Sequence, residues 1–337
     1  PWTWAERTHV MRALAPYGYD RFIYAPKADL FLRRRWAEAH PRDAAAALRA
    51  FGKDCADANV RFGVGLSPFE LHLDWTATGR AELTRRVSEL VDLGIDILAL
   101  LFDDMRGDVP DLAKRQAEIA AVAAAAAPDA QLIVCPSYYS DDPVLDRAFG
   151  QRPDGYLEEL GRLLPDAVQI FWTGPEVCSR ELSKGHLART AGTLGRPVTL
   201  WDNYPVNDGP RMSKHLHLRA PTGRARGAAH IAAHYVNPAL QPHLTLLPAA
   251  GLAEAWSMAG DYDYFDATQR IARDLYGDTF GTALTDALLS LQDGGLDGLD
   301  VETMAAKLAP FDHPAATEVR RFLAGDYKIT GAEVQTQ

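Results

Sequence analysis

The sequence predicts an α/β fold, namely a (β/α)8 TIM barrel followed by a small helical region. Short apolar runs alternate with helical patterns at intervals of roughly 30 to 40 residues, which is the repeat of a parallel barrel. The chain has 337 residues and 47% of them are hydrophobic, enough for one large barrel with something appended. Polar side chains follow several of the apolar runs, and enzymes with this fold place their chemistry at the carboxyl ends of the strands.

Seven runs are predicted to be strands because they are short, apolar and bounded by turn signals. They are residues 21–26, 61–68, 98–102, 131–136, 167–173, 197–201 and 228–236. A closed barrel of this class needs eight strands, and the chain opens with a helical pattern. We therefore expect the first strand upstream of Pro1. Residues 1–250 would form the catalytic barrel and residues 251–337 the helical region.

The first helix is expected to begin near residue 4 and to end before Pro16, because Thr3 and Glu6 match a capping box. Further helices of the barrel are expected over residues 30–38, 41–59, 78–93, 110–127, 153–164 and 176–193, with a loop over 209–226. Beyond residue 250, helical patterns cover residues 263–276, 282–292, 301–308 and 313–324, and a loose tail follows at 331–337. No strand separates these last helices, which indicates a helical region packed on the barrel.

Composition excludes several classes of function. The net charge of −10 argues against a nucleic-acid or anionic-membrane partner, and no apolar run is long enough to span a membrane. The three cysteines are scattered and odd in number, so they predict neither a disulfide framework nor a zinc site. Because the chain starts at Pro1, the sequence does not indicate the compartment.

Histidines are the candidate metal ligands of this sequence. They are His215, His217, His230 and His234. The last two have the spacing of a helical zinc pair, but we expect them on a strand, where residues four apart lie far from each other. No nearby carboxylate completes the set, and there is no glycine-rich phosphate loop. We therefore expect no metal and no cofactor.

The apolar run 98–102 ends abruptly in two adjacent carboxylates, Asp103 and Asp104. Adjacent side chains on a regular strand point to opposite faces, so the two can share a substrate only if the strand has ended before them. Two carboxylates this close disfavour joint ionisation, which holds a proton on one of them. One charged and one protonated carboxylate is the arrangement that hydrolyses glycosidic bonds. Alternatively both are loop residues, or one caps the next helix.

The other predicted strands also end in polar or aromatic side chains. They are Lys27, Tyr139, Trp172, Asn203 with Asp208, and Asn237. Amides, carboxylates and a lysine can pair with sugar hydroxyls, and aromatic rings can wall an apolar pocket. Each has an ordinary alternative as an exposed loop lysine, a turn former around Pro205, or a packing ring. Together they favour a sugar site at one end of the barrel.

Seven segments of the chain match one known family in order. They are Pro1-Trp2 with Glu6 and Arg7, Tyr24-Ala-Pro-Lys27, Leu101-Phe-Asp-Asp104, Cys135-Pro-Ser-Tyr-Tyr139, Phe171-Trp-Thr-Gly-Pro175, Trp201-Asp-Asn-Tyr-Pro-Val-Asn-Asp208, and Asn237-Pro238 with Gln241. With these segments the chain resembles the catalytic domain of the O-GlcNAcases, glycoside hydrolase family 84, also called hyaluronidase-like β-N-acetylglucosaminidases. The resemblance covers roughly residues 1 to 250. The helical remainder of the chain matches the family much less well.

The resemblance implies a retaining exo-β-N-acetylglucosaminidase. In that family the substrate's own 2-acetamido oxygen attacks the anomeric carbon and forms an oxazoline. By analogy, Asp103 would orient the acetamido N–H and Asp104 would protonate the leaving oxygen and then activate water. The sequence itself does not assign the proton to either carboxylate.

The resemblance also implies binding roles, carried over position by position. Tyr139 would bond near the acetamido oxygen; Cys135, Trp201 and Asn203 would shape the acetyl pocket; Lys27, Asp208 and Asn237 would hold the sugar hydroxyls. A buried packing thiol remains the alternative for Cys135. The expected partners are β-GlcNAc glycosides or O-GlcNAc-modified proteins, and the sequence leaves a homodimer open.

Two departures from the family pattern affect the expected site. The family's first strand carries a Glu-Gly-Phe-Tyr-Gly pattern before Pro-Trp, whereas this sequence begins at Pro1-Trp2. Tyr138 stands where the family usually has a glutamate.

A non-catalytic reader of GlcNAc-modified proteins is the alternative function. It would keep the pocket and lose the acid, so the presence of both Asp103 and Asp104 favours catalysis.

Overall fold

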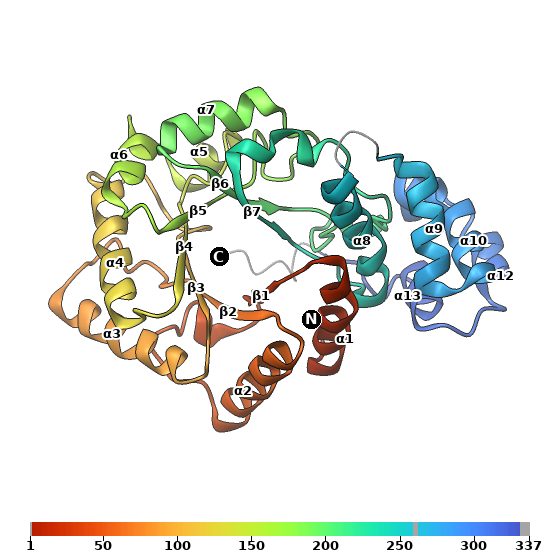
Figure 1. The fold of residues 1–337 in the computed structure, drawn as a ribbon, viewed down its shortest axis with the longest axis horizontal. Coiled ribbons are helices and arrows are strands. Elements are labelled where there is room, and N and C mark those ends of the chain that lie inside the picture. Colours follow the sequence, from red (N-terminus) through yellow and green to blue (C-terminus); the bar gives the residue numbers. More distant parts are fainter. Residues whose placement is uncertain (1, 259–261, 331–337) are drawn as a thin grey trace.

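Seven parallel strands form one curled sheet in the computed structural model, which describes residues 2–258 and 262–330. The strands are β1 (Arg21–Tyr24), β2 (Arg61–Leu66), β3 (Ile97–Leu101), β4 (Gln131–Cys135), β5 (Gln169–Trp172), β6 (Val198–Asp202) and β7 (Ile231–Val236). They lie in sequence order, each beside the next, with helices on the outer side of the sheet (Figure 1). Among the described residues neither β1 nor β7 pairs with an eighth strand, so the structure has a curled, barrel-like sheet rather than a closed barrel.

Eight α-helices accompany the sheet. They are α1 (Trp4–Leu14), α2 (Arg42–Asp57), α3 (Ala77–Val91), α4 (Leu112–Ala126), α5 (Val144–Phe149), α6 (Tyr156–Leu163), α7 (Lys184–Leu194) and α8 (Pro242–Met258). The capping box that starts α1 is confirmed, because the Glu6 N–H donates to Thr3 Oγ1 and the Thr3 N–H donates to Glu6 Oε2. The sequence did not predict α5 or α8. No helix in the described part of the chain is long and apolar enough to cross a membrane.

The helix predicted over residues 30–38 is wrong. The chain forms only a short 3-10 turn there, η2 (Leu30–Leu32), followed by turns. Arg33 has φ −131° and ψ −103°, outside the helical region. Side chains from α3 bind the carbonyls of this segment, since Arg86 donates to Phe31 O and Arg85 to Ala37 O. These tertiary hydrogen bonds satisfy two carbonyls of a segment whose backbone forms turns and not a helix.

Two further boundaries differ near the end of the barrel region. The helix predicted over 176–193 begins only at Lys184, because Ser183 Oγ accepts the His186 N–H and caps it. The strand predicted over 228–236 begins only at Ile231, since residues Arg224–His230 form the 3-10 helix η4. His230 therefore lies in a helical turn and not on the strand where the sequence placed it. Another 3-10 turn, η3 (Met212–Lys214), lies in the predicted loop.

The remaining helices gather in a lobe at one side of the sheet (Figure 1). They are α9 (Tyr264–Tyr276), α10 (Asp278–Asp286), α11 (Gly295–Gly298), α12 (Val301–Leu308) and α13 (Pro314–Leu323). The helix predicted over 282–292 is interrupted, because α10 ends at Asp286 and a π-helical turn, η6 (Ser290–Gly294), follows. The predicted loose tail, residues 331–337, lies outside the described residues. Helix α8 spans the expected boundary at residue 250.

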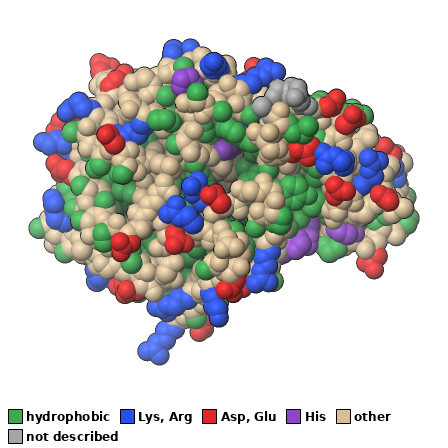
Figure 2. All heavy atoms as spheres, viewed as in Figure 1, with side chains coloured by type: hydrophobic (Ala, Val, Ile, Leu, Met, Phe, Trp, Pro, Cys, Tyr) green, Lys and Arg blue, Asp and Glu red, His purple; other side chains and the backbone are tan. Residues whose placement is uncertain are grey.

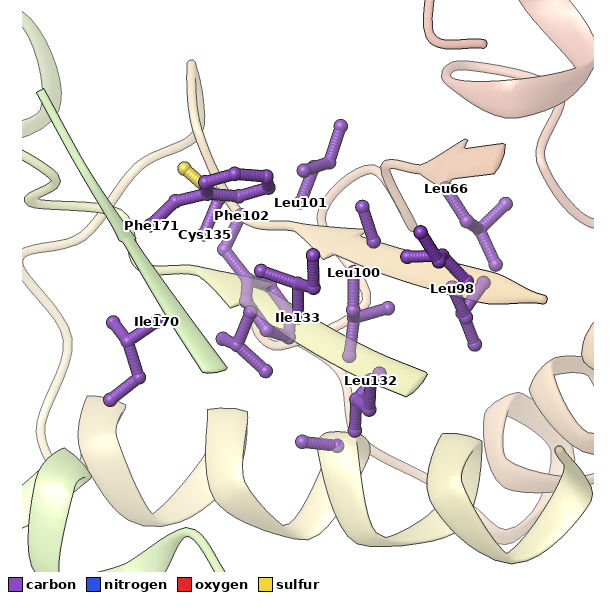
Figure 3. Packing of buried hydrophobic residues seen from close by; sticks show 14 of the residues in the cluster. Leu66, Leu98, Leu100, Leu101, Phe102, Leu132, Ile133, Cys135, Ile170 and Phe171 are labelled. Atoms are coloured by element: carbon purple, nitrogen blue, oxygen red, sulfur yellow. The ribbon is translucent and has the colours of Figure 1, made fainter. Parts of the chain in front are cut away.

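The two larger hydrophobic cores among the described residues correspond to these two parts. The larger is built on the sheet, and every residue of β3 is buried, which explains its unbroken apolar run. Figure 3 shows Leu98, Leu100 and Ile133 packed among the strands and the neighbouring helix. The smaller core joins Leu244 and Leu247 of α8 to the helices of the lobe. Acidic and basic side chains are interspersed over the face shown in Figure 2.

Candidate active site

Asp103 and Asp104 lie in a turn directly after the carboxyl end of β3. The strand ends at Leu101, and Asp104 has φ 56°, a left-handed backbone that stops the alternation of side chains. Arg33 lies against both carboxylates. Its Nη1 is 3.9 Å from Asp103 Oδ2 and its Nη2 is 3.5 Å from Asp104 Oδ2. The sequence required the strand to end before the pair, and this condition is met.

Asp103 is the carboxylate with an unsatisfied oxygen. Its Oδ1 is buried and has no hydrogen-bond partner within the described residues. Burial, and then the neighbouring charge of Asp104, raise the pKa of Asp103 to about 6, while the charges of Arg33 and Lys27 act in the opposite direction. A carboxylate in this state accepts a hydrogen bond readily from a ligand N–H.

The carboxyl end of β4 presents two uncharged groups to the pair. The Cys135 thiol is buried, and burial followed by the charges of Asp103 and Asp104 raises its pKa well above the ordinary value. The Tyr139 hydroxyl also has a raised pKa, first through burial and then through the same two carboxylates. Both groups therefore remain protonated at neutral pH and can act as neutral hydrogen-bond donors.

Two amides connect the ends of β6 and β7. Asn237 Nδ2 donates to Asn203 Oδ1 over 2.9 Å, and Asn203 Nδ2 donates to the Val177 carbonyl over 2.8 Å. Trp201, in β6, is half-buried and packs edge-on against Phe171, with 5.0 Å between ring centroids. These contacts hold the amides and the indole at the same end of the sheet.

Lys27 and Asp208 form an open ion pair between the loop after β1 and the loop after β6. Lys27 Nζ lies 3.9 Å from Asp208 Oδ2, and the side chains are 51% and 44% exposed. The Lys27 charge also opposes the upward shift of the Asp103 pKa. Exposed charges of this kind are available to bind hydroxyls of a ligand.

Some residues singled out from sequence lie elsewhere. Trp172 is fully buried and its Nε1 donates to His186 Nε2 of α7 over 3.0 Å, so it packs on the helix side of the sheet. Tyr138 is also buried and donates to the Gly150 carbonyl over 2.6 Å. His215 and His217 contact backbone carbonyls of Gln292 and Pro205. These side chains serve packing and loop structure.

A cleft of about 440 Å³ adjoins the carboxylate pair on the side of Asp104. Its walls include Phe69, Glu70, Met105, Arg106 and Phe149. Of the predicted site residues only Asp104 lines this cleft.

Most of this chain matches one known protein family. A profile described as beta-N-acetylglucosaminidase (NAGidase) matches residues 1–293. The chain belongs to this family. The resemblance drawn from its sequence segments is thereby confirmed.

Named relatives of this β-N-acetylglucosaminidase-family chain include the protein O-GlcNAcases of Rattus norvegicus and Mus musculus. Each is 26% identical over 237 residues, which are 67% of this chain and 25% of the relative. The chain thus spans a quarter of the length of these relatives. A solved mutant of the Thermobaculum terrenum O-GlcNAc hydrolase is 25% identical, with a TM-score of 0.83, covering 97% of this chain and 79% of that one.

Arg33 at the acid pair, and the structural ion pair of Asp202 and Arg224, escaped the sequence analysis of this family member. Asp202 is buried at the end of β6, where Arg224 Nε donates to its Oδ2 over 2.8 Å. Alternation along the strand could have indicated that Asp202 points away from Trp201. No sequence signal separates Arg33 from the adjacent Arg34 and Arg35, because its role depends on how the loop folds.

Proposed function

We propose that this chain is a retaining exo-β-N-acetylglucosaminidase that removes terminal β-linked GlcNAc, in particular GlcNAc linked to Ser or Thr of proteins. One observation carries the proposal: Asp103 and Asp104 lie side by side beyond a strand end, and Oδ1 of Asp103 is buried without a hydrogen-bond donor. Family membership supports the sugar. The relatives named protein O-GlcNAcase support the protein-linked form.

In the proposed reaction the 2-acetamido oxygen of the substrate attacks the anomeric carbon. The bond from that carbon to the leaving oxygen breaks as Asp104 donates its proton to that oxygen. Asp103 accepts the acetamido N–H and stabilises the positive charge that develops on the oxazoline. Water then attacks the anomeric carbon, Asp104 takes its proton, and the acetamido group is restored with retained configuration.

The surrounding side chains have binding roles in this proposal. The neutral Tyr139 hydroxyl donates to the acetamido oxygen or the intermediate, and Cys135, Trp201 and Asn203 surround the acetyl group. Lys27, Asp208 and Asn237 bind the sugar hydroxyls. The open Lys27–Asp208 pair supports this assignment, because both charges remain accessible.

The fold of the catalytic unit is also part of the proposal. We infer an eight-stranded barrel in which a further strand lies between β1 and β7. The helical region from residue 251 follows this barrel along the chain. The sequence order of the seven strands and the curl of their sheet support it.

Hydrolysis of 4-nitrophenyl β-GlcNAc, measured beside the β-glucose analogue, tests the activity. Turnover of the GlcNAc glycoside alone is expected, since only that sugar carries the acetamido nucleophile. Turnover of both would contradict acetamido assistance. Binding of GlcNAc without turnover would instead support the non-catalytic reader.

Replacement of the proposed acid should have an effect that depends on the leaving group. Asp104→Asn is expected to abolish turnover of GlcNAc linked to serine while sparing part of the turnover of an activated phenyl glycoside, because a good leaving group needs little protonation. Steady-state kinetics on both substrates measure the difference. Equal loss on both would argue against Asp104 as the acid.

Replacement of the proposed hydroxyl ligand should weaken binding. Asp208→Ala is expected to raise the inhibition constant of a GlcNAc-derived oxazoline mimic by roughly ten- to a hundredfold, the loss of charged hydrogen bonds worth about 1.5–3 kcal/mol. Inhibition titrations measure it. An unchanged inhibition constant would refute the role of Asp208.

A further inference from the structure

The loop between β1 and α2 places Arg33 against both carboxylates of the proposed acid pair. Its side chain is 16% exposed, and it contacts Oδ2 of Asp103 and Oδ2 of Asp104 at 3.9 and 3.5 Å. We propose that Arg33 is a positioning residue of this glycosidase, which keeps Asp103 ionised and turns its Oδ1 toward the substrate. This role rests on the proposed function. In it, one side chain controls the charge state of the carboxylate pair.

Asp103 needs a cation because its other surroundings oppose ionisation. The groups that face it are Asp104, Arg33, Lys27, the Cys135 thiol and the Tyr139 hydroxyl. Burial and the charge of Asp104 both favour the protonated form of Asp103. A protonated Asp103 could still accept a hydrogen bond, but it would not stabilise the positive charge of an oxazoline.

Lys27 is the other cation near the pair, and its position suits it less well for this role. Its side chain is 51% exposed and its ammonium group lies 3.9 Å from Asp208. Arg33 is more buried and lies against both carboxylates with separate guanidinium nitrogens. Because it touches Oδ2 of Asp103, Oδ1 is left for a ligand.

A buried hydrogen-bond network holds the loop that carries Arg33. Asp29 accepts three hydrogen bonds, from the Tyr24 hydroxyl over 3.1 Å, the Phe31 N–H over 3.0 Å and His40 Nε2 over 3.1 Å. Burial alone would raise the pKa of Asp29, but the hydrogen bonds from His40 and Tyr24 outweigh it and lower the pKa. Asp29 therefore stays charged and holds both ends of the loop.

Arg86 of α3 completes this hydrogen-bond network. Its Nη2 donates to His40 Nδ1 over 2.9 Å and to the Phe31 carbonyl over 3.2 Å, and the residue is buried. Since His40 Nδ1 accepts from Arg86, the ring proton must be on Nε2, where it donates to Asp29. These hydrogen bonds connect α3 through the loop to β1 and so support the backbone that carries Arg33 to the acid pair.

The pH dependence of kcat/KM on 4-nitrophenyl β-GlcNAc tests the role of Arg33. Arg33→Met is expected to move the acidic limb upward by about one pH unit or more, because a cation within about 4–6 Å lowers a carboxyl pKa by that amount. At a pH below the limb, kcat/KM should then fall about tenfold relative to wild type. Arg33→Lys retains the charge and should recover most of the shift.

Arg34→Met is the matched control, since Arg34 follows Arg33 on the same loop but lies over the Phe69 ring at 5.3 Å. Its acidic limb should coincide with that of wild type. Asp29→Asn should reproduce part of the Arg33→Met shift, and add little to it in the double variant. The proposal is overturned if Arg33→Met and Arg33→Lys lower kcat/KM by one factor at every pH.

A carbon-13 NMR titration of the Asp103 carboxyl separates this inference from the proposed activity. The resonance is assigned by its loss in Asp103→Asn, and its titration requires no turnover. A higher midpoint in Arg33→Met than in wild type supports the role of Arg33 even if the glycoside is not hydrolysed. An equal midpoint refutes it even if the enzyme is active.

Discussion

Two aspartates at the ends of different strands, each with a buried oxygen, differ in how those oxygens are satisfied. Asp202, at the end of β6, is 2% exposed, as is Arg224, and it accepts from Arg224 Nε over 2.8 Å and His234 Nε2 over 3.1 Å. Burial would raise the pKa of Asp202, but the His234 hydrogen bond and the Arg224 charge outweigh it and lower the pKa. Asp103, beyond β3, has a buried oxygen without a donor and a pKa raised to about 6.

The difference separates a structural carboxylate from one available for chemistry. Arg224 also donates to the carbonyls of Ser179 and Arg180, so the Asp202 pair ties β6 to the loop before α7. Trp256 of α8 donates to His234 Nδ1 over 3.0 Å, which adds β7 and α8. Asp103 has no such set of donors. Its buried oxygen is stabilised only when a ligand supplies a hydrogen-bond donor.

Removal of Arg224 should produce the largest loss of stability. Arg224→Met leaves Asp202 with a buried charge and only His234 beside it, which is expected to lower the free energy of unfolding by about 3–5 kcal/mol. Urea denaturation measures it. The matched control Arg226→Met removes an exposed arginine two residues away and should stay within about 0.5 kcal/mol of wild type. Equal effects of the two variants would show that Asp202 does not depend on its partner.

Asp103→Asn should have the opposite sign. The pKa of Asp103 in the folded state, about 6, lies above the ordinary value. The protonated carboxyl therefore contributes fully to the free energy of unfolding below the unfolded-state pKa, and this contribution is lost as the pH rises through 6. A neutral amide avoids that loss, so the variant should be more stable than wild type at pH 7 by about 1–3 kcal/mol, and no more stable below about pH 4. Denaturation at both pH values measures this, and a gain that persists at pH 4 would contradict it.

Replacement of His234 should have the smallest effect. His234→Gln is expected to lower the free energy of unfolding by about 1 kcal/mol. The glutamine amide can donate to Asp202 and accept from Trp256, so both hydrogen bonds of His234 are weakened but not lost, and Arg224 still pairs with Asp202. The same urea denaturation, run beside Arg224→Met, measures it. A loss as large as that of Arg224→Met would mean that the imidazole, and not the guanidinium, satisfies Asp202.

Local sequence patterns predicted the elements whose formation depends on their own residues. The run that ends in Asp103 and Asp104 predicted β3 because all five residues of that strand are buried. The Thr3–Glu6 capping box predicted the start of α1. Helix α8 was missed because it is apolar on nearly every side and carries no amphipathic period.

The predicted site residues belong to this local category as well. Strand ends in a parallel sheet meet at one edge, so Lys27, Asp103, Tyr139 and Asn237 could be assigned to one end of the fold before any coordinates. Their roles in binding and catalysis remain predictions that the proposed experiments address.

The order of strands, the family and the adjacent carboxylates could be predicted from the sequence, because each depends on neighbouring residues. Which of the two carboxylates has its hydrogen bonds satisfied became visible only in the fold. Arg224 reaches Asp202 across 22 positions, and Arg86 reaches His40 across 46. Arg33 is separated from Asp103 by 103 − 33 = 70 positions, and the two meet through the fold of the loop, whose carbonyls accept hydrogen bonds from α3 side chains. Ionisation depends on the charges and donors around a group in space, and these distant partners follow no local pattern.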